Sequence, residues 1–174
     1  MKSLTDHLSQ YASYHRDPRN IATHFVGIPM IVVAVVVLLS RPLLQGIDVA
    51  GIALSPAVLA SLLAAIFYIR LDWRLGLLMA VFLAATLVFG AWIATQSTPV
   101  WLWLGAGSFV VGWIIQFIGH VFEGRKPAFL DDVSGLIIGP LFVLVEALFL
   151  LGMLPQLRQQ IEAKAGPVRR NQPA

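Results

Sequence analysis

The segment WIIQFIGHVFEGRKPAFLDD, residues 113–132, contains the two features that decide the fold. Its first half is the end of a long apolar run, and its second half is a polar motif with a histidine, a glutamate and two aspartates. A related motif, YHRDPRNIATHF at residues 14–25, comes just before the first apolar run of the chain. This pattern is typical of a membrane protein whose polar residues gather where hydrophobic helices begin and end.

The composition also indicates an integral membrane protein. Of the 174 residues, 58% are hydrophobic and only 12% are charged, which leaves too little polar surface for a soluble domain of this size. Cysteine is absent, so disulfides, thiolate metal ligands and a cysteine nucleophile are excluded. The net charge is +3, and the basic residues lack the aromatic interleaving of nucleic-acid-binding proteins. We expect them to contact membrane lipids and not nucleic acid.

Five apolar segments follow an amphipathic N-terminal helix that is expected over residues 3–15. Each is a candidate for crossing roughly 30 Å of hydrocarbon, and together they cover residues 21–40, 54–69, 75–95, 100–121 and 133–154. The predicted fold class is therefore all-α, a polytopic membrane helical bundle. We expect one membrane-embedded domain over residues 1–154 and a polar, flexible tail over residues 155–174. The first apolar run starts too late for a signal peptide.

Basic residues set the expected topology. They precede the first segment and lie in the second and fourth loops, which places the N-terminus and these loops in the cytoplasm by the positive-inside rule. Five full crossings would then leave the basic residues of the tail outside: Arg158, Lys164, Arg169 and Arg170. Either the fifth segment, which contains Pro140 and Glu146, is re-entrant or interfacial, or the tail overrides a weak rule.

Three histidines are expected at one membrane face. His15 and His24 flank the start of the first segment, and His120 lies at the end of the fourth, which returns to the same side. On one continuous helix, the nine residues between His15 and His24 would turn them to roughly opposite faces. Asp17 and Pro18, however, form a helix-start signal, because Asp can cap exposed N–H groups and Pro suits the first helical position. A break here allows both histidines to face one point.

Imidazoles with carboxylates nearby suit a metal ion. Neutral imidazole binds iron, zinc, copper or nickel, and several histidines with a nearby carboxylate and open positions are typical of non-haem iron or zinc. The chain has no HExxH or HxxxH pattern, so spacing alone leaves both a metal site and structural histidines open. The fourth histidine, His7, is expected to be an ordinary surface residue.

Polar residues around the fourth segment allow more than one interpretation. Small and polar residues recur along it at spacings of three and four: Gly105, Ser108, Gly112, Gln116, Gly119 and Glu123. The glycines indicate a close helix–helix packing face, whereas the polar members need partners at membrane depth and could line a cavity. In the following loop, Arg125 and Lys126 could hold a lipid carboxylate or phosphate, or serve topology alone. Asp131 could bind a metal, orient a histidine or cap the next helix.

The two motifs and one later segment resemble a known family. The segments YHRDPRNIATHFVGIP (14–29), WIIQFIGHVFEGRKPAFLDD (113–132) and FVLVEALFLLGMLP (142–155) are similar to the Mpo-like family of 2-hydroxy fatty acid dioxygenases. These are small multi-spanning proteins of fungi and bacteria, formerly catalogued as a domain of unknown function. The resemblance extends over about residues 11–154. It implies an Fe²⁺-dependent enzyme that uses O2 to shorten 2-hydroxy fatty acids by one carbon, as in fatty acid α-oxidation.

The site residues of this family can be matched to positions of this sequence. The implied metal ligands are His15, His24 and His120; the implied catalytic residues are Glu123, Asp131 and Asn20; and the expected substrate-binding residues are Arg125, Lys126 and Gln116. Arg16 departs from the family pattern, which has a second histidine at this position. Either that histidine is not required, or this member differs.

Two other classes of function fit the same residues. A different metalloenzyme on this scaffold, such as a lipid hydroxylase or a zinc-dependent hydrolase, would differ in metal identity and in oxygen dependence. A non-enzymatic transporter or assembly protein would need no stoichiometric metal, but the sequence lacks the inverted repeats that are usual in transporters. For the dioxygenase we expect a site at the cytoplasmic headgroup level of a bacterial inner membrane, or of the endoplasmic reticulum in a eukaryote.

Overall fold

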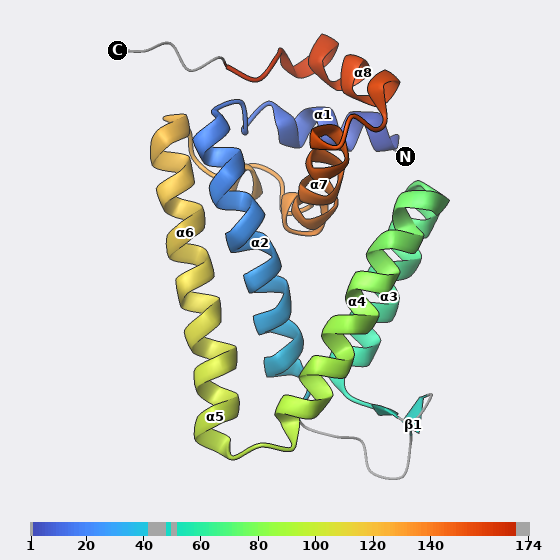
Figure 1. Ribbon diagram of the computed structural model, residues 1–174, viewed down its shortest axis with the longest axis vertical. Helices are drawn as coiled ribbons and strands as arrows, with labels where there is room; N and C mark the ends of the chain where they lie inside the picture. The colour runs from blue at the N-terminus through green and yellow to red at the C-terminus, as the bar shows by residue number, and fades with distance from the viewer. Residues whose placement is uncertain (1, 42–47, 50–51, 170–174) are drawn as a thin grey trace. The chain divides into compact units, whose positions relative to one another are not determined.

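The computed structural model describes residues 2–41, 48–49 and 52–169, and the chain divides into two compact units (Figure 1). The first unit consists of Met1–Ile28 and Trp113–Ala174, and the second is Pro29–Gly112. Two long helices, α2 (Pro18–Leu39) and α6 (Ser108–Glu123), belong partly to each unit. The other elements of the first unit are α1 (Leu4–Ala12), the 3-10 turn η2 (Ala128–Leu130), α7 (Gly135–Leu150) and α8 (Pro155–Ala165). The second unit adds β1 (Asp48–Val49), β2 (Ile52–Ala53), α3 (Pro56–Leu71), α4 (Trp73–Ala94), α5 (Thr98–Leu102) and the π-helical turn η1 (Trp103–Gly107).

Among the described residues, three helices are long and apolar enough to cross a membrane. They are α2, α4 and the run of α5, η1 and α6 over Thr98–Glu123. The predicted fold class, a polytopic helical bundle, is confirmed, and the short strands β1 and β2 form a single antiparallel pair. The second apolar segment, predicted over residues 54–69, forms α3 two residues further along the chain and with the same length of 16 residues. Its length of about 24 Å falls short of roughly 30 Å of hydrocarbon.

In the second unit, Asp72 makes the tight joint between α3 and α4. Its extended backbone ends α3, and its side chain accepts hydrogen bonds from the backbone N–H groups of Arg74 at 3.0 Å and Leu75 at 2.9 Å. Shortly after the joint, Gly76 faces the backbone of Ile69 so closely that a Cβ would overlap it. The two helices therefore form a close hairpin that a larger residue at position 76 would force apart.

The second unit also contains one end of the predicted small-residue face. Gly105 meets the side chain of Leu38, where a Cβ would lie 2.5 Å from Cδ2. The indole N–H of Trp101 donates to the carbonyl oxygen of Val37 at 2.7 Å. The close packing that was predicted for Gly105 is therefore confirmed, and its partner is the end of α2.

In the first unit, α8 packs against α1. Ser3 and Asp6 form a capping box that starts α1, and the buried side chains of Leu8 and Ile161 have exposed fractions of 0% and 1%. An ion pair of 2.6 Å between Lys164 and Asp6 joins the two helices. The prediction of a flexible tail from residue 155 is thus corrected for Pro155–Ala165. The burial of Ile161 against the rest of the unit stabilises this polar segment as a helix.

The fifth apolar segment does not continue straight. Its helix α7 has only 16 residues, and the axis turns by 119° into α8. Both flanks of α7 lie beside α1: Asp132 before it accepts a hydrogen bond from Gln10 at 3.1 Å, and α8 after it packs on α1 as described. The segment therefore leaves α1 and returns to it, as a re-entrant segment does. This arrangement favours the re-entrant alternative for the fifth segment. Of the basic residues of the tail, Arg170 lies outside the described residues.

Candidate metal centre

The break between α1 and α2 brings His15 close to His24. The first helix ends at Ala12, three residues before the predicted end at His15, and the second begins at Pro18, as predicted. The carboxylate of Asp17 accepts the backbone N–H of Arg19 at 2.8 Å and so caps α2. His15 lies in the turn between the helices, whereas His24 lies within α2. The change of direction allows both side chains to face the same point.

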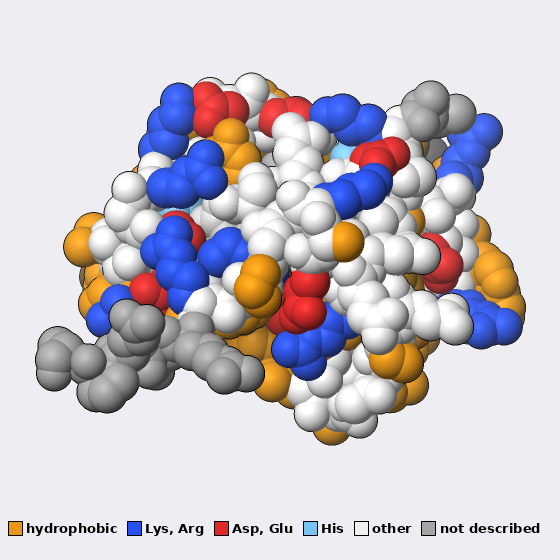
Figure 2. All heavy atoms as spheres, turned by 90° about the horizontal axis from the view of Figure 1, so that it is seen from above, with side chains coloured by type: hydrophobic (Ala, Val, Ile, Leu, Met, Phe, Trp, Pro, Cys, Tyr) orange, Lys and Arg blue, Asp and Glu red, His pale blue; other side chains and the backbone are white. Residues whose placement is uncertain are grey.

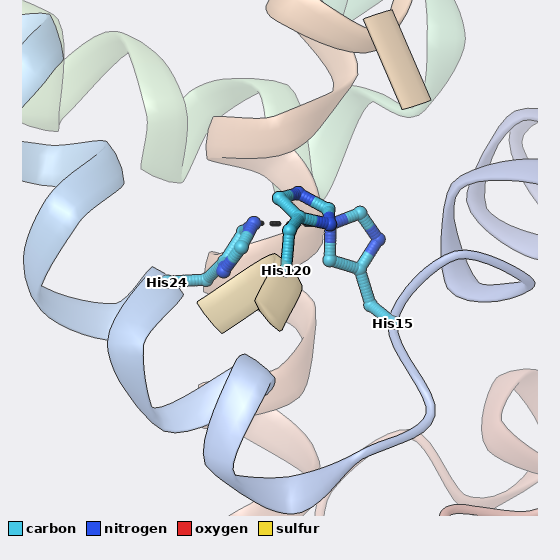
Figure 3. Close-up of side chains that lie close together, drawn as sticks. All are labelled: His15, His24 and His120. Atoms are coloured by element: carbon cyan, nitrogen blue, oxygen red, sulfur yellow. Dashed lines mark hydrogen bonds between the residues drawn. The ribbon is translucent and has the colours of Figure 1, made fainter. Parts of the chain in front are cut away.

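The imidazoles of His15, His24 and His120 converge, each from a different segment (Figure 3). Their ring centroids are 4.5 Å apart for His15 and His24, 5.1 Å for His15 and His120, and 5.2 Å for His24 and His120. One nitrogen atom of each ring lies within 4.8 Å of those of the other two. The exposed fractions are 0%, 1% and 8%. The three histidines that the sequence placed at one face thus form one buried cluster.

Backbone carbonyl groups fix the orientation of two of these rings. Nδ1 of His15 lies 2.7 Å from the carbonyl oxygen of Tyr11, and Nδ1 of His24 lies 2.8 Å from that of Asn20. Because a carbonyl oxygen can only accept, each Nδ1 carries a proton, and each neutral ring presents a lone pair on Nε2. The two Nε2 atoms are 3.0 Å apart. Two lone pairs therefore face each other unless a cation lies between them.

The donor set fits a first-row metal ion. Imidazole nitrogens bind such ions at about 2.0–2.1 Å, so two nitrogens on one ion lie about 3 to 4 Å apart, as the Nε2 atoms of His15 and His24 do. Histidines that bind metals commonly donate their other N–H to a carbonyl or carboxylate, which is the arrangement of these two rings. Within the described residues, the group of possible ligands consists of the three histidines without a carboxylate.

The ring of His15 lies between aromatic side chains. It stacks on Tyr11 with a centroid separation of 4.1 Å and an interplanar angle of 8°, and Phe142 of α7 lies 5.6 Å away. Burial, together with the neighbouring His24, lowers the pKa of His15 well below its ordinary value. The ring is therefore neutral at pH 7, which is the form that binds a metal ion.

Glu123 holds the turn that carries His15. Its Oε2 accepts hydrogen bonds from the backbone N–H groups of Arg16 at 3.0 Å and Asp17 at 2.8 Å, and from the side-chain amide of Asn20 at 3.0 Å. A carboxylate at the start of α2 is also favoured by the helix dipole. Glu123 lies three residues after His120 at the end of α6. It therefore ties the helix of His120 to the turn of His15 and does not join the histidine nitrogens.

Asn20 of α2 lies against Gly119 of α6. Its side-chain amide donates to Glu123 and, at 3.3 Å, to the carbonyl oxygen of Tyr14, while its own carbonyl oxygen anchors His24. A Cβ on Gly119 would overlap Thr23 Oγ1 and lie 2.5 Å from Asn20 Oδ1. Asn20 thus orients the site from within the helix contact, and the packing role predicted for Gly119 is confirmed.

Gln116 lies one helical turn before His120 on the same helix and is 4% exposed. Among the described residues, its Nε2 has no hydrogen-bond partner. Nδ1 of His120 is likewise buried without a hydrogen-bond partner among the described residues. Buried polar groups normally find a partner. Two such groups on one face of α6 could both bind a polar ligand.

Three of the predicted site residues lie apart from the histidines. Arg125 donates to the carbonyl oxygen of Ser13 at 2.7 Å and lies over the ring of Tyr14, 4.6 Å from its centroid. Lys126 forms an ion pair of 2.6 Å with Asp131, which is exposed. Asp131 also accepts a hydrogen bond from Tyr14 at 2.9 Å, and a hydrogen bond from that hydroxyl and the Lys126 ammonium lower its pKa.

These charges belong to a surface of mixed sign. Figure 2 looks down on the face that carries α1 and α8, where basic and acidic side chains alternate. Ion pairs on it include Lys2 with Asp132 and Arg158 with Glu162. The surface therefore offers no field of a single sign, and Arg125, Lys126 and Asp131 link the loop after α6 to the end of α1.

Two residues near the site were missed by the sequence analysis. Tyr11, which anchors and stacks on His15, lies one helical turn before it, so aromatic spacing on the first helix could have indicated it. Arg169 contacts Glu123 at 3.3 Å, but nothing in the polar tail distinguished it from the other basic residues. Glu146 of α7 lies 3.7 Å from the Arg16 guanidinium.

Fold and site together define a small helical protein with spans typical of membranes and a buried cluster of three histidines. Residues 1–151 match the family model of the 2-hydroxy-palmitic acid dioxygenase Mpo1-like proteins, and the chain belongs to this family. It is 33% identical over 162 residues to the 2-hydroxy-palmitic acid dioxygenase MPO1 of Saccharomyces cerevisiae, which covers 91% of this chain and 87% of the yeast protein. No solved structure matches. The family resemblance inferred from the motifs is confirmed.

Proposed function

We propose that this protein is a membrane-embedded, Fe²⁺-dependent dioxygenase that shortens 2-hydroxy fatty acids by one carbon. The observation that carries the proposal is the pair of Nε2 atoms of His15 and His24, 3.0 Å apart and both unprotonated in the neutral rings, with His120 beside them. The similarity to a 2-hydroxy-palmitic acid dioxygenase supplies the class of substrate. Fatty acid dioxygenase activity follows from the family, whereas the metal and the membrane location belong to the proposal.

The residues of the chain have distinct roles in this proposal. His15, His24 and His120 hold the metal, and the carbonyl groups of Tyr11 and Asn20 keep two of the rings in the tautomer that can bind it. Glu123 and Asn20 act as positioning residues, because they bind the turn and the helix that carry the histidines. The aromatic rings of Tyr11 and Phe142 exclude water from one side of His15.

The substrate is placed by polar groups at its head and by the membrane along its tail. Gln116, with a buried and unused donor among the described residues, hydrogen-bonds an oxygen of the 2-hydroxy acid. Arg125 and Lys126 attract its carboxylate at headgroup level, although both already have partners on the protein. Asp131 forms an ion pair with Lys126 and does not enter the site. The acyl chain extends along the apolar helices into the hydrocarbon, whose lipids are the remaining partner.

When bound, iron(II) supplies an electron-rich centre for O2 with positions left open for a 2-hydroxy acid. The reaction balances without a second reductant. The bond between C1 and C2 breaks, C2 becomes the carboxyl carbon of the shorter acid and C1 leaves as carbon dioxide. The four electrons that these carbons lose reduce one O2. We place the site on the cytoplasmic side of the membrane, which the basic residues of the loops support.

Oxygen consumption in detergent tests the proposal. Protein loaded with Fe²⁺ under nitrogen is mixed with oxygenated buffer and either 2-hydroxypalmitate or palmitate, which lacks only the hydroxyl group. We expect O2 uptake with 2-hydroxypalmitate alone and a product with fifteen carbon atoms by mass spectrometry, in agreement with the loss of C1. Equal uptake with both acids, or a hydroxylated product of full length, would contradict it.

A zinc-dependent lipid hydrolase is the second candidate, because three histidines alone are also the ligand set of catalytic zinc sites. The observation that favours it is the absence of a carboxylate from the ligand group within the described residues. Zn²⁺-loaded protein would then cleave an ester or amide lipid under nitrogen. Activity that depends on both Fe²⁺ and O2 would exclude this alternative.

A further inference from the structure

The chain returns to the histidine cluster after α8. The last helix ends at Ala165, and Gly166 has a φ of +82°, a left-handed conformation that turns the chain without strain in glycine. Residues 166–169, here called the C-terminal strap, then run beside the turn of residues 15–17. The family match ends at residue 151, so the strap lies outside the part of the chain that defines the family.

Two hydrogen bonds fasten the strap to Arg16. The guanidinium Nη1 of Arg16 donates to the carbonyl oxygen of Gly166 at 2.9 Å, and the backbone N–H of Arg169 donates to the carbonyl oxygen of Arg16 at 2.8 Å. Arg16 is buried, with an exposed fraction of 6%, and its Nε also donates to the carbonyl oxygen of His15 at 2.9 Å. The strap therefore holds both the backbone and the side chain of the residue next to a proposed ligand.

The third contact of the strap is with Glu123. The side chain of Glu123 has an exposed fraction of 0%, and a guanidinium nitrogen of Arg169 lies 3.3 Å from its Oε1. That oxygen has no hydrogen-bond partner among the described residues, so the guanidinium is the group that offsets its charge there. Oε2 of the same carboxylate holds the turn of His15. A buried charge needs an opposite charge or hydrogen bonds nearby. The half-exposed guanidinium of Arg169 provides the opposite charge for Glu123.

We propose that Arg169 is a positioning residue of the metal centre and that the C-terminal strap sets the orientation of His15. The ion pair keeps the Glu123 side chain in place, Glu123 keeps the N–H groups of Arg16 and Asp17 in place, and this turn keeps His15 directed at His24. This inference rests on the proposed function in one respect, namely that the histidines bind a metal. The hold of the strap on the turn does not depend on that function.

The first measurement concerns the metal-free protein. Hydrogen–deuterium exchange is followed in the full-length protein for peptides that contain Arg16 and Asp17, whose amides donate to Glu123. In Arg169→Ala we expect these amides to exchange about tenfold faster, because the turn opens more often. The matched control is Arg158→Ala, which removes an arginine of α8 that pairs with Glu162 on its own helix and should leave the exchange unchanged.

The second measurement uses Co²⁺ as a probe of the histidines. Binding to detergent-purified protein is titrated through the visible absorption of the bound ion, which reports its ligand geometry. Loss of residues that orient metal ligands typically weakens metal binding about 10- to 100-fold, so we expect this loss and an altered spectrum in Arg169→Ala. Arg169→Lys, which keeps the charge, should restore most of the affinity, and Arg158→Ala should match the wild type.

The outcomes separate the two proposals. If the wild type binds no Co²⁺ but Arg169→Ala exchanges faster, the metal assignment fails and the hold of the strap on the turn stands. If the wild type binds Co²⁺ and Arg169→Ala equals it in affinity and spectrum, Arg169 is not a positioning residue, whatever the exchange shows. If Arg169→Ala and Arg158→Ala lose affinity equally, the effect belongs to α8 as a whole and the proposal for Arg169 is overturned.

Discussion

Glu123 acts through the residues it binds and not through contact with the histidine nitrogens. The sequence motif suggested a catalytic carboxylate, yet Oε2 accepts from two backbone N–H groups and one amide at the start of α2. Such a carboxylate links the ends of two helices that each carry a histidine. Glu123 therefore acts as a buried helix cap. Its contribution to the site is to hold the two helices in position.

Replacement of Glu123 tests this role. Glu123→Ala leaves the N–H groups of Arg16 and Asp17 without a partner in a buried turn, so we expect a loss of about 2 to 5 kcal/mol of stability. Glu123→Gln keeps one acceptor oxygen and should lose clearly less. Thermal unfolding in detergent measures both. A variant Glu123→Ala with wild-type stability but no activity would instead indicate a direct catalytic role.

The loop charges give a different prediction. Lys126 is exposed and pairs with Asp131 away from the histidines, and exposed pairs contribute little. Lys126→Ala should therefore leave Co²⁺ affinity unchanged within about twofold. If the carboxylate of the substrate binds at headgroup level, the variant should raise the KM for 2-hydroxypalmitate and leave kcat unchanged. A loss of metal would show that this loop belongs to the centre after all.

At this scale the sequence identified the three clustered histidines better than the residues that hold them in place. His15, His24 and His120 could be predicted because each lies beside a helix boundary, and boundaries have local signals such as Asp17 followed by Pro18. The contact of Arg169 with Glu123 joins residues that are far apart in the chain. Its existence depends on how α8 packs, for which the polar tail gives no periodic signal.

The crossing of α2 and α6 is the element that sets the spacing of two histidines. His24 and His120 lie on these helices, and Gly119 permits the close approach beside Asn20 and Thr23. A larger residue at position 119 must push the helices apart or displace the side chain of Asn20, which also holds Glu123. Such a shift would change the spacing of the histidines, although the new side chain would contact none of them.

Gly119→Ala is expected to destabilise the protein by about 1 to 3 kcal/mol through overpacking and to weaken Co²⁺ binding. Gly107→Ala, in the π-helical turn η1 before α6, is the matched control, because a Cβ there would meet only Trp103 at 3.4 Å, an ordinary contact. Unfolding temperature and Co²⁺ titration of the two variants decide the matter. Equal behaviour of the two variants would mean that the crossing can relax freely.

Helix positions were largely predictable because each apolar run is bounded by polar or proline residues. The bounds of α3 were predictable to within two residues, because Ser55 and Pro56 start the helix just after the apolar residue Leu54. Pro140 was expected to disturb the fifth segment, but α7 passes through it. The chain turns instead after α7, where Leu154 has a positive φ of 54° just before Pro155.

At the scale of the whole molecule, the fifth apolar segment turns by 119° after α7 instead of continuing straight, and α8 lies beside α1. The proximity of α8 to α1 puts the basic residues of both on one side, in agreement with the positive-inside rule. Apolar length alone could not predict this, because a run that crosses and a run that turns back have the same composition. The charges of the tail were the signal that distinguished them.

Labelling of single cysteines tests this topology. The sequence has no native cysteine, so the introduced cysteine is the only thiol in each variant. Lys2→Cys and Lys164→Cys should react with a membrane-impermeant maleimide from the same side in oriented vesicles. Ser97→Cys, at the other end of the Thr98–Glu123 span, should react from the opposite side. Reaction of positions 2 and 164 from opposite sides would show that the fifth segment crosses.

The central claim is that three histidines bind one metal ion, and metal content tests it most directly. The protein is purified in detergent with iron present and oxygen excluded, and elemental analysis compares the wild type with His120→Ala and with His7→Ala, a histidine on α1 outside the cluster. We predict close to one iron per chain in the wild type and in His7→Ala, and almost none in His120→Ala. Absence of metal from the wild type, or retention of iron in His120→Ala, would contradict the account.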